Sequence, residues 1–319
     1  MHALGLRGLA IGVAVCAALH VAPTAAQDDP VTSLRARVSA APDDVSLRCQ
    51  LAFALVGASQ HEEARTVASA AIAAVPRPLD ASRRRLLGAC LYNLGRAEEG
   101  LGHRLEASTA YVRSLAVRDN DAVRARLHTL VPEAPADDPT VALALVSSRP
   151  DDTYGAVHPS SIVRVGGDVF HFVPFSVRGS EGAELVLAVV VVREDAVAVA
   201  TIESWAQEDY EARLVASDAR AWSARGAATG AAGAMATVQA TGGGHCDDAE
   251  GYADFSHTAT VFASFDGTRV RTAALVTEQY DCEEPVSLTM QVRGTDVVVR
   301  RARHGSLQPG TYPIESLLR

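Results

Sequence analysis

PEAPADDP, residues 132–139, divides this 319-residue chain into two stretches with different hydrophobic patterns. Its prolines cannot continue a helix, and its acidic residues bury little apolar surface. Before it, apolar residues recur at helical spacing, and beyond it, short runs of β-branched and aromatic residues alternate. We therefore expect an α+β multidomain chain: helical residues 27–130, a linker at 131–155 that contains a strand at 141–146, and β-rich residues 156–319.

The helical stretch contains several segments with an apolar stripe. The segments predicted to be helices are 44–59, 61–75, 80–100, 104–117 and 121–130. Pro76 and Pro78 end the second of them, because proline lacks the amide hydrogen that a helix needs.

One part of this stretch has small and large packing residues at a characteristic spacing. They are Leu91-Tyr92-Asn93-Leu94-Gly95, Gly102, Ala107, Tyr111 and Ser114-Leu115. This pattern resembles a tetratricopeptide repeat (TPR), with one unit of about 34 residues at 88–121. The resemblance implies that the small residues let two helices approach closely and that the aromatic residue fills the gap between hairpins.

A weaker copy of the repeat begins near Val45, and the two copies together cover about a third of the chain. Its matching residues are Leu51-Ala52, Ala64, Ala68, Ala71 and Pro76. Ser59 stands where the better copy has Gly102, Asp119 stands where proline is usual, and residues 31–40 supply at most half of a third copy. Such hairpins present a concave surface to a protein or peptide partner, or else they pack on the neighbouring domain as a scaffold.

The β-rich half is expected to be an antiparallel meander in a sandwich or an open barrel. Asp266-Gly267 predicts a two-residue turn that sets Phe265 opposite Thr268. A second hairpin is expected to turn at Gly294-Thr295. Pro174 indicates a sheet edge or a bulge. The other expected strands are 169–177, 184–192 and 196–202, with weaker ones at 213–216 and 235–240.

Residues 1–26 have the pattern of a cleavable secretory signal. A basic residue, Arg7, precedes the apolar run 8–19, and small residues stand at the last and third-last positions before Gln27. A membrane anchor would need about 20 apolar residues, and a lipid anchor at Cys16 is disfavoured by the bulky Val15 before it. We expect an exported protein, periplasmic or extracellular, with no membrane span after cleavage.

Composition argues against two classes of partner. The net charge is −9, and all 29 basic residues are arginine, which together with abundant alanine is typical of a GC-rich bacterial genome. An acidic chain has little reason to bind nucleic acid or anionic lipid.

Four cysteines remain after the signal, and in an oxidising compartment they predict disulfides. The register of the Asp266-Gly267 hairpin places Cys282 opposite Gly251, so a Cys246–Cys282 disulfide is expected at that end of the hairpin. Cys49 and Cys90 either pair across stacked repeats or remain small core residues.

Carboxylates gather beside the same cysteines. The Ca²⁺ candidates are Asp247, Asp248, Glu250, Asp281 and Glu283, with Asp254 and Glu284 nearby. Six to eight oxygen ligands suit Ca²⁺, but the spacing does not match an EF-hand, and solvated acidic loops beside a disulfide are the favoured explanation of the cluster. His245 and His257 lack a second pair of zinc ligands.

The sequence contains no recognisable catalytic motif and predicts no cofactor or catalytic residue. The leading hypothesis is a non-enzymatic exported protein whose repeats bind or scaffold another protein. The alternatives are a β-domain that binds Ca²⁺ or a saccharide near Cys246 and Cys282, and a hydrolase. A concave pocket with a histidine and a carboxylate within hydrogen-bond reach would favour the hydrolase.

Overall fold

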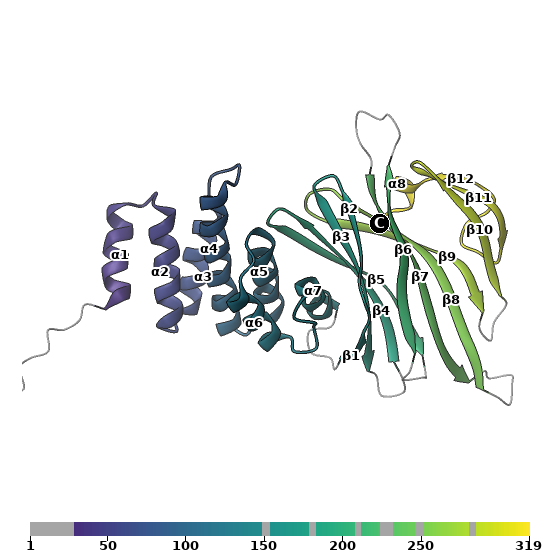
Figure 1. Ribbon diagram of the computed structural model, residues 1–319, viewed down its shortest axis with the longest axis horizontal. Helices are drawn as coiled ribbons and strands as arrows, with labels where there is room; N and C mark the ends of the chain where they lie inside the picture. The colour runs from purple at the N-terminus through teal and green to yellow at the C-terminus, as the bar shows by residue number, and fades with distance from the viewer. Residues whose placement is uncertain are drawn as a thin grey trace, which may run out of the picture.

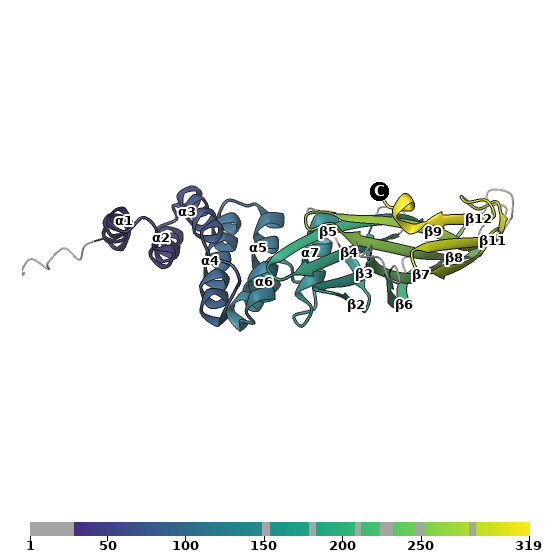
Figure 2. The same ribbon diagram turned by 90° about the horizontal axis from the view of Figure 1, so that it is seen from above.

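The computed structural model describes residues 29–148, 154–178, 183–207, 212–223, 232–245, 252–280 and 285–319. Helices come first and two antiparallel sheets follow, so the chain is α+β with a β-rich C-terminal half. The helices and the sheets succeed one another along the longest axis, with α1 at the end farthest from the strands (Figures 1 and 2). The predicted signal, 1–26, lies outside the described residues.

All five predicted helical segments form helices, and residues 30–40 form a further complete helix. Their bounds are α1 (Pro30–Ala40), α2 (Val45–Gly57), α3 (His61–Ala73), α4 (Ala81–Gly100), α5 (Arg104–Val117) and α6 (Asp121–Leu130). Four of them begin at a residue whose side chain accepts a backbone N–H of the first turn, which is the expected role of an N-cap. These caps are Asp29, Asp44, Asp80 and Asn120.

Helices α4 and α5 approach closely where the sequence places small residues. A Cβ built on Gly95 would lie 2.4 Å from Cε1 of Tyr111, so only glycine leaves room for that ring. The Tyr111 hydroxyl donates to Glu99 at 2.6 Å, and the Ser114 hydroxyl donates to the Gly88 carbonyl at 2.8 Å. Ala107 is buried and Leu94 is half-buried at the same pair of helices.

The two interhelical turns differ in one residue. Gly102, between α4 and α5, has φ of +80° with open space around it, and Ser59, between α2 and α3, has φ of 58°. A left-handed backbone is favourable for glycine but costs an L-residue about 1–2 kcal/mol. Ser59 therefore carries a conformational cost that Gly102 avoids.

The strands form two antiparallel sheets. The first contains β1 (Tyr154–Val157), β2 (Ser161–Val165), β3 (Asp168–Arg178), β4 (Ala183–Arg193) and β5 (Ala196–Gln207), and the second contains β6 (Arg213–Ser223), β7 (Ala232–His245), β8 (Tyr252–Phe265), β9 (Val270–Tyr280), β10 (Val286–Arg293), β11 (Asp296–Arg303) and β12 (Gly310–Pro313). Phe170 and Leu187 of the first sheet and Val238 and Val261 of the second share one buried cluster. The sheets thus face each other across a common core.

Pro174 lies within β3, opposite Leu187 of β4. On its other side β2 pairs as far as Phe172, and the carbonyl of Pro174 accepts from the amide of His158 at 3.0 Å, just after β1 ends. The proline therefore sits where one short neighbouring strand gives way to another. This is the edge-like position in which a missing N–H does no harm.

The predicted register of the Asp266-Gly267 hairpin was wrong by two residues. Phe265 pairs with Val270, and four residues form the loop. The Asp266 carboxylate accepts the amides of Thr268 and Arg269, both at 2.8 Å, which stabilises the longer turn. The expected position of Cys282 opposite Gly251 was extrapolated from the two-residue turn, so it does not follow from the observed register. The second hairpin is confirmed, with Arg293 opposite Asp296.

The expectation of a strand at 141–146 was also wrong. These residues belong to helix α7 (Pro139–Ser148), and all of them are at most 2% exposed. A short apolar run has no polar face, so periodicity cannot separate a buried strand from a buried helix. Helix α7 packs between α5 and the outer face of the first sheet, in a cluster that extends from Tyr111 to Phe175.

Polar contacts reinforce this junction at the β4–β5 turn. Asp195, 7% exposed, accepts from Nε of Arg113 through its backbone carbonyl at 2.7 Å. Its carboxylate also contacts Nη2 of Arg113 at 3.3 Å and Nη2 of Arg77 at 2.7 Å. Glu194 beside it is exposed and stands 3.7 Å from Arg77. One buried carboxylate therefore links two arginines of the helical part to a strand turn.

The two interhelical turns give a reciprocal stability test. Ser59→Gly should raise the free energy of unfolding by about 0.5–1 kcal/mol, because glycine relieves the left-handed strain but adds entropy to the unfolded chain. Gly102→Ser should lower it by a similar amount, since open space surrounds that position. Urea denaturation of both variants checks this, and equal shifts in the same direction would contradict it.

The Asp195 linkage gives a second test. Asp195→Asn should lower the free energy of unfolding by about 1–3 kcal/mol, because charge-assisted hydrogen bonds to two arginines are weakened at a buried position. Glu194→Gln changes the neighbouring residue and the same arginine but should stay within about 0.5 kcal/mol, as exposed ion pairs contribute little. Equal losses in thermal or urea unfolding would refute the role given to Asp195.

Candidate functional site

A groove of about 900 Å³ lies on the helical part. Helices α1, α2 and α4 form its walls, and it lies at the end of the molecule away from the sheets (Figure 1). Most of its lining is apolar. The lining residues are Asp29, Pro30, Val31, Leu34, Ser46, Cys49, Gln50, Phe53, Ala54, Gly57, Ala58, Leu86, Ala89, Tyr92 and Asn93.

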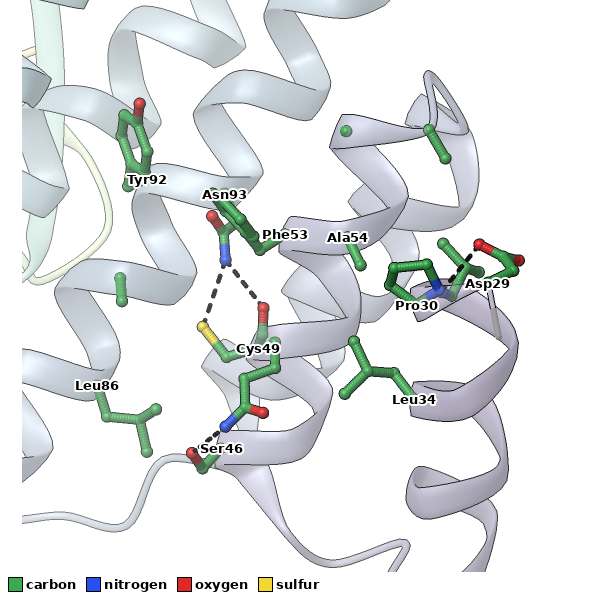
Figure 3. Close-up of a pocket in the computed structure, with 15 residues that line it drawn as sticks. Asp29, Pro30, Leu34, Ser46, Cys49, Phe53, Ala54, Leu86, Tyr92 and Asn93 are labelled. Atoms are coloured by element: carbon green, nitrogen blue, oxygen red, sulfur yellow. Dashed lines mark hydrogen bonds between the residues drawn. The ribbon is translucent and has the colours of Figure 1, made fainter. Parts of the chain in front are cut away.

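Phe53 is the one large apolar side chain that is exposed among the described residues lining the groove. Its residue is 57% exposed, although it belongs to a helix whose other large apolar residues are buried. Figure 3 shows it beside Asn93, with Pro30 and Leu34 of α1 on the far side of α2's Ala54. An exposed ring within an apolar hollow leaves surface that a partner can cover.

The helical spacing of α2 explains why Phe53 faces outward. Ser46, Gln50, Phe53 and Gly57 recur at intervals of three and four residues and all line the groove. The buried stripe, which includes Leu51 and Leu55, faces the neighbouring helices. The apolar stripe predicted for this helix from the sequence does not include Phe53. An aromatic residue on a helix stripe that is otherwise small and polar is the sequence feature that would have indicated it.

Asn93 fixes the distance between α2 and α4 at the floor of the groove. It is 4% exposed, and its side-chain amide donates to the Cys49 carbonyl at 2.9 Å and to Cys49 Sγ at 3.5 Å (Figure 3). A helix carbonyl normally bonds only within its own helix, so this contact joins two helices through a buried polar group. It makes the floor rigid.

Cys49 and Cys90 are both free and buried, and they share one small cluster with Ala71. The structure therefore places them together as small core residues. The hydrogen bond with the Cys49 sulfur, and then burial, raise the pKa of the Cys90 thiol, which keeps it in the neutral form.

The groove contains little charge. Asp29 is the single acidic or basic side chain among the described lining residues apart from a thiol and a phenol. Hydrogen bonds from the Thr32 hydroxyl and the Val31 amide lower the pKa of Asp29, so it is an ionised N-cap whose oxygens are already used. The described lining therefore offers mainly shape and apolar surface.

The predicted disulfide and calcium residues all fall between the described parts of the strands. Cys246, Asp247, Asp248, Glu250, Asp281, Cys282, Glu283 and Glu284 lie outside the described residues, as do the side chains of His245 and Asp254. Across the part of the chain that the structure describes, no three His, Cys, Asp or Glu side chains are grouped to hold a metal ion. No helix in that part has the length and apolar character to cross a membrane.

No family model, curated protein or solved structure matches this chain.

Asn93 offers a test of how the groove is held. Asn93→Ala should lower the free energy of unfolding by about 1–3 kcal/mol, because the buried carbonyl and sulfur of Cys49 lose their donor. Gln50→Ala, on the exposed rim of the same groove, should stay within about 0.5 kcal/mol. Urea denaturation followed by circular dichroism measures both, and an unchanged Asn93→Ala midpoint would contradict a bracing role.

Proposed function

We propose that this chain is an exported protein-binding protein whose helical groove holds an apolar peptide segment of a partner protein. In this proposal α2 to α5 are two degenerate TPR-like hairpins, and α1 completes the groove wall. The observation that carries it is the exposed Phe53 within the 900 Å³ apolar groove.

The size and lining of the groove favour a peptide segment. Sites of about 300–1,000 Å³ with apolar walls and few polar groups typically bury a ligand of small-molecule size, and a few apolar side chains of a peptide segment would fill the same space. Among the described residues the lining has no basic side chain, and its one acidic side chain caps α1. A strongly charged ligand would lose hydration there without gaining an ion pair, so an apolar segment is the better fit.

The position of the groove favours an external partner over internal scaffolding. Helices α5, α6 and α7 share a core with the first sheet, so they already serve as the cover of that sheet. Helices α1 and α2 stand at the opposite end of the molecule (Figure 1), where the sheets do not reach. In this proposal α5 to α7 cover the first sheet, and the helices at the other end of the array bind the partner.

Phe53→Ser is the decisive variant. We expect peptides selected from a displayed random library on the full chain to be rich in large apolar residues. Their affinity should fall at least about tenfold in Phe53→Ser, because an apolar anchor of this size contributes about 1.5–3 kcal/mol when covered. Fluorescence anisotropy of the selected peptides measures the loss.

Tyr280→Ser is the matched control, because Tyr280 is 65% exposed on β9, far from the groove. It should leave peptide affinity within about twofold. Thermal unfolding should show that both variants keep the fold, as exposed substitutions rarely change stability by more than about 0.5 kcal/mol. Selection of no peptide, or of peptides that bind Phe53→Ser equally well, would refute the proposal.

A further inference from the structure

A second hollow, of about 590 Å³, lies where the helical part meets the first sheet. Val112 and Leu115 of α5 form one wall, and Ile162, Val169 and Val192 of β2, β3 and β4 form the other. Ile162 is 52% exposed although it is large and apolar. The cleft therefore offers an apolar interior that this chain leaves partly uncovered.

A chain of hydrogen bonds fixes His171 at one end of this cleft. The Thr140 hydroxyl donates to Asp138 Oδ1 at 2.6 Å and lies 3.2 Å from Nδ1 of His171. Because a hydroxyl has one hydrogen, Thr140 must accept from His171, and the neutral ring carries its proton on Nδ1. Nε2 then has a free lone pair and no partner among the described residues.

Asp138 orients Thr140 and, through it, His171. Both oxygens of its carboxylate already accept hydrogen bonds from the protein. Its Oδ1 also accepts the Thr140 amide at 3.2 Å, and its Oδ2 accepts the Ser160 hydroxyl at 2.6 Å. The carboxylate is thus occupied on both oxygens. This is the second layer of support that keeps a functional side chain in one orientation.

Arg164 supplies a cation at the same end. It is exposed on β2 and lines the cleft, with no ion-pair partner among the described residues. Arg164 pairs with Val169 and Ile162 pairs with His171, so Arg164 and His171 are diagonal neighbours on one face of adjacent strands. The other arginine of the cleft, Arg124, is held by Asp119 at 2.7 Å.

From this arrangement we infer that the cleft binds an amphipathic carboxylate, whose anionic group pairs with Arg164 beside His171 and whose apolar chain lies between α5 and the sheet. A guanidinium pairs well with a carboxylate, and the apolar walls exclude a ligand that is charged along its length. This site is separate from the helical groove.

The state of His171 makes the binding depend on pH. Burial lowers the pKa of His171, Arg164 lowers it further, and Asp138 opposes both. The other charged groups at the cleft are Asp137 and Arg124. A bound carboxylate neutralises Arg164 and raises the pKa of His171, so binding takes up a proton at Nε2. Affinity is therefore greatest below the lowered pKa of the free protein and falls as pH rises through the pKa of the complex.

Octanoate titrated into the full chain by calorimetry tests this inference. We expect binding that tightens from pH 8 to pH 5.5, by about tenfold for each unit by which the pKa of His171 rises, with proton uptake visible as a dependence on the buffer's ionisation heat. Octanamide has the chain without the charge and inorganic phosphate has the charge without the chain, so both should bind at least about tenfold more weakly, the loss expected when one contact of about 1.4 kcal/mol is missing.

Three variants locate the site. Arg164→Gln should weaken octanoate at least about tenfold, whereas Arg301→Gln, the same change on exposed β11, should leave it within about twofold. His171→Gln should abolish the pH dependence while octanoate still binds. Phe53→Ser should bind octanoate normally, which separates this site from the groove. Absence of octanoate binding, equal binding by Arg164→Gln, or phosphate binding as tight as octanoate would each overturn the inference.

Discussion

Helix α7 has apolar side chains on every side, and the rest of the structure is arranged to cover them. Residues 141–146 are almost completely buried, with α5 and α6 on one side and strands β3 to β5 on the other. Burying a Val or Leu side chain contributes roughly 1.5–3 kcal/mol, so an uncovered α7 would be strongly unfavourable. Because the outer face of the first sheet also needs a cover, one helix satisfies the sheet and the helical array together.

Helix α7 covers only part of the helical array and of the first sheet. The groove around Phe53 and the cleft beside His171 lie on opposite sides of the covered region. Toward the N-terminus, α1 to α4 extend past the reach of the sheet, so the groove around Phe53 is left open. Toward β2, the helix begins at Pro139, and Ile162 and Arg164 at the edge of the cleft stay exposed. The hydrogen bonds of Asp138 and Thr140 at the start of α7 then position His171 in that gap.

The two surfaces differ in their electrostatics, and the proposed ligands differ accordingly. In the part of the chain that the structure describes, the groove has one ionised side chain, which already caps a helix. There the cleft has an arginine without an ion-pair partner and a histidine with a free nitrogen. The links from Asp195 to Arg77 and Arg113 hold both regions on one framework. A carboxylate in the cleft and an apolar peptide in the groove would therefore bind at separate sites of one molecule and contact different residues.

The sequence by itself determined the features that depend on local spacing. Helices α2 to α6 and the Gly294-Thr295 hairpin follow from periodicities and turn residues within a few positions. Tertiary structure decided the rest. A run of apolar residues fits a buried strand as well as α7, and the Asp266 side chain accepts two amides in a turn longer than the sequence pattern predicted. The exposure of Phe53 depends on which of the described helices pack against α2. The pairing of Thr140 with His171 joins residues 31 positions apart, and such convergence is set by packing that no local pattern records.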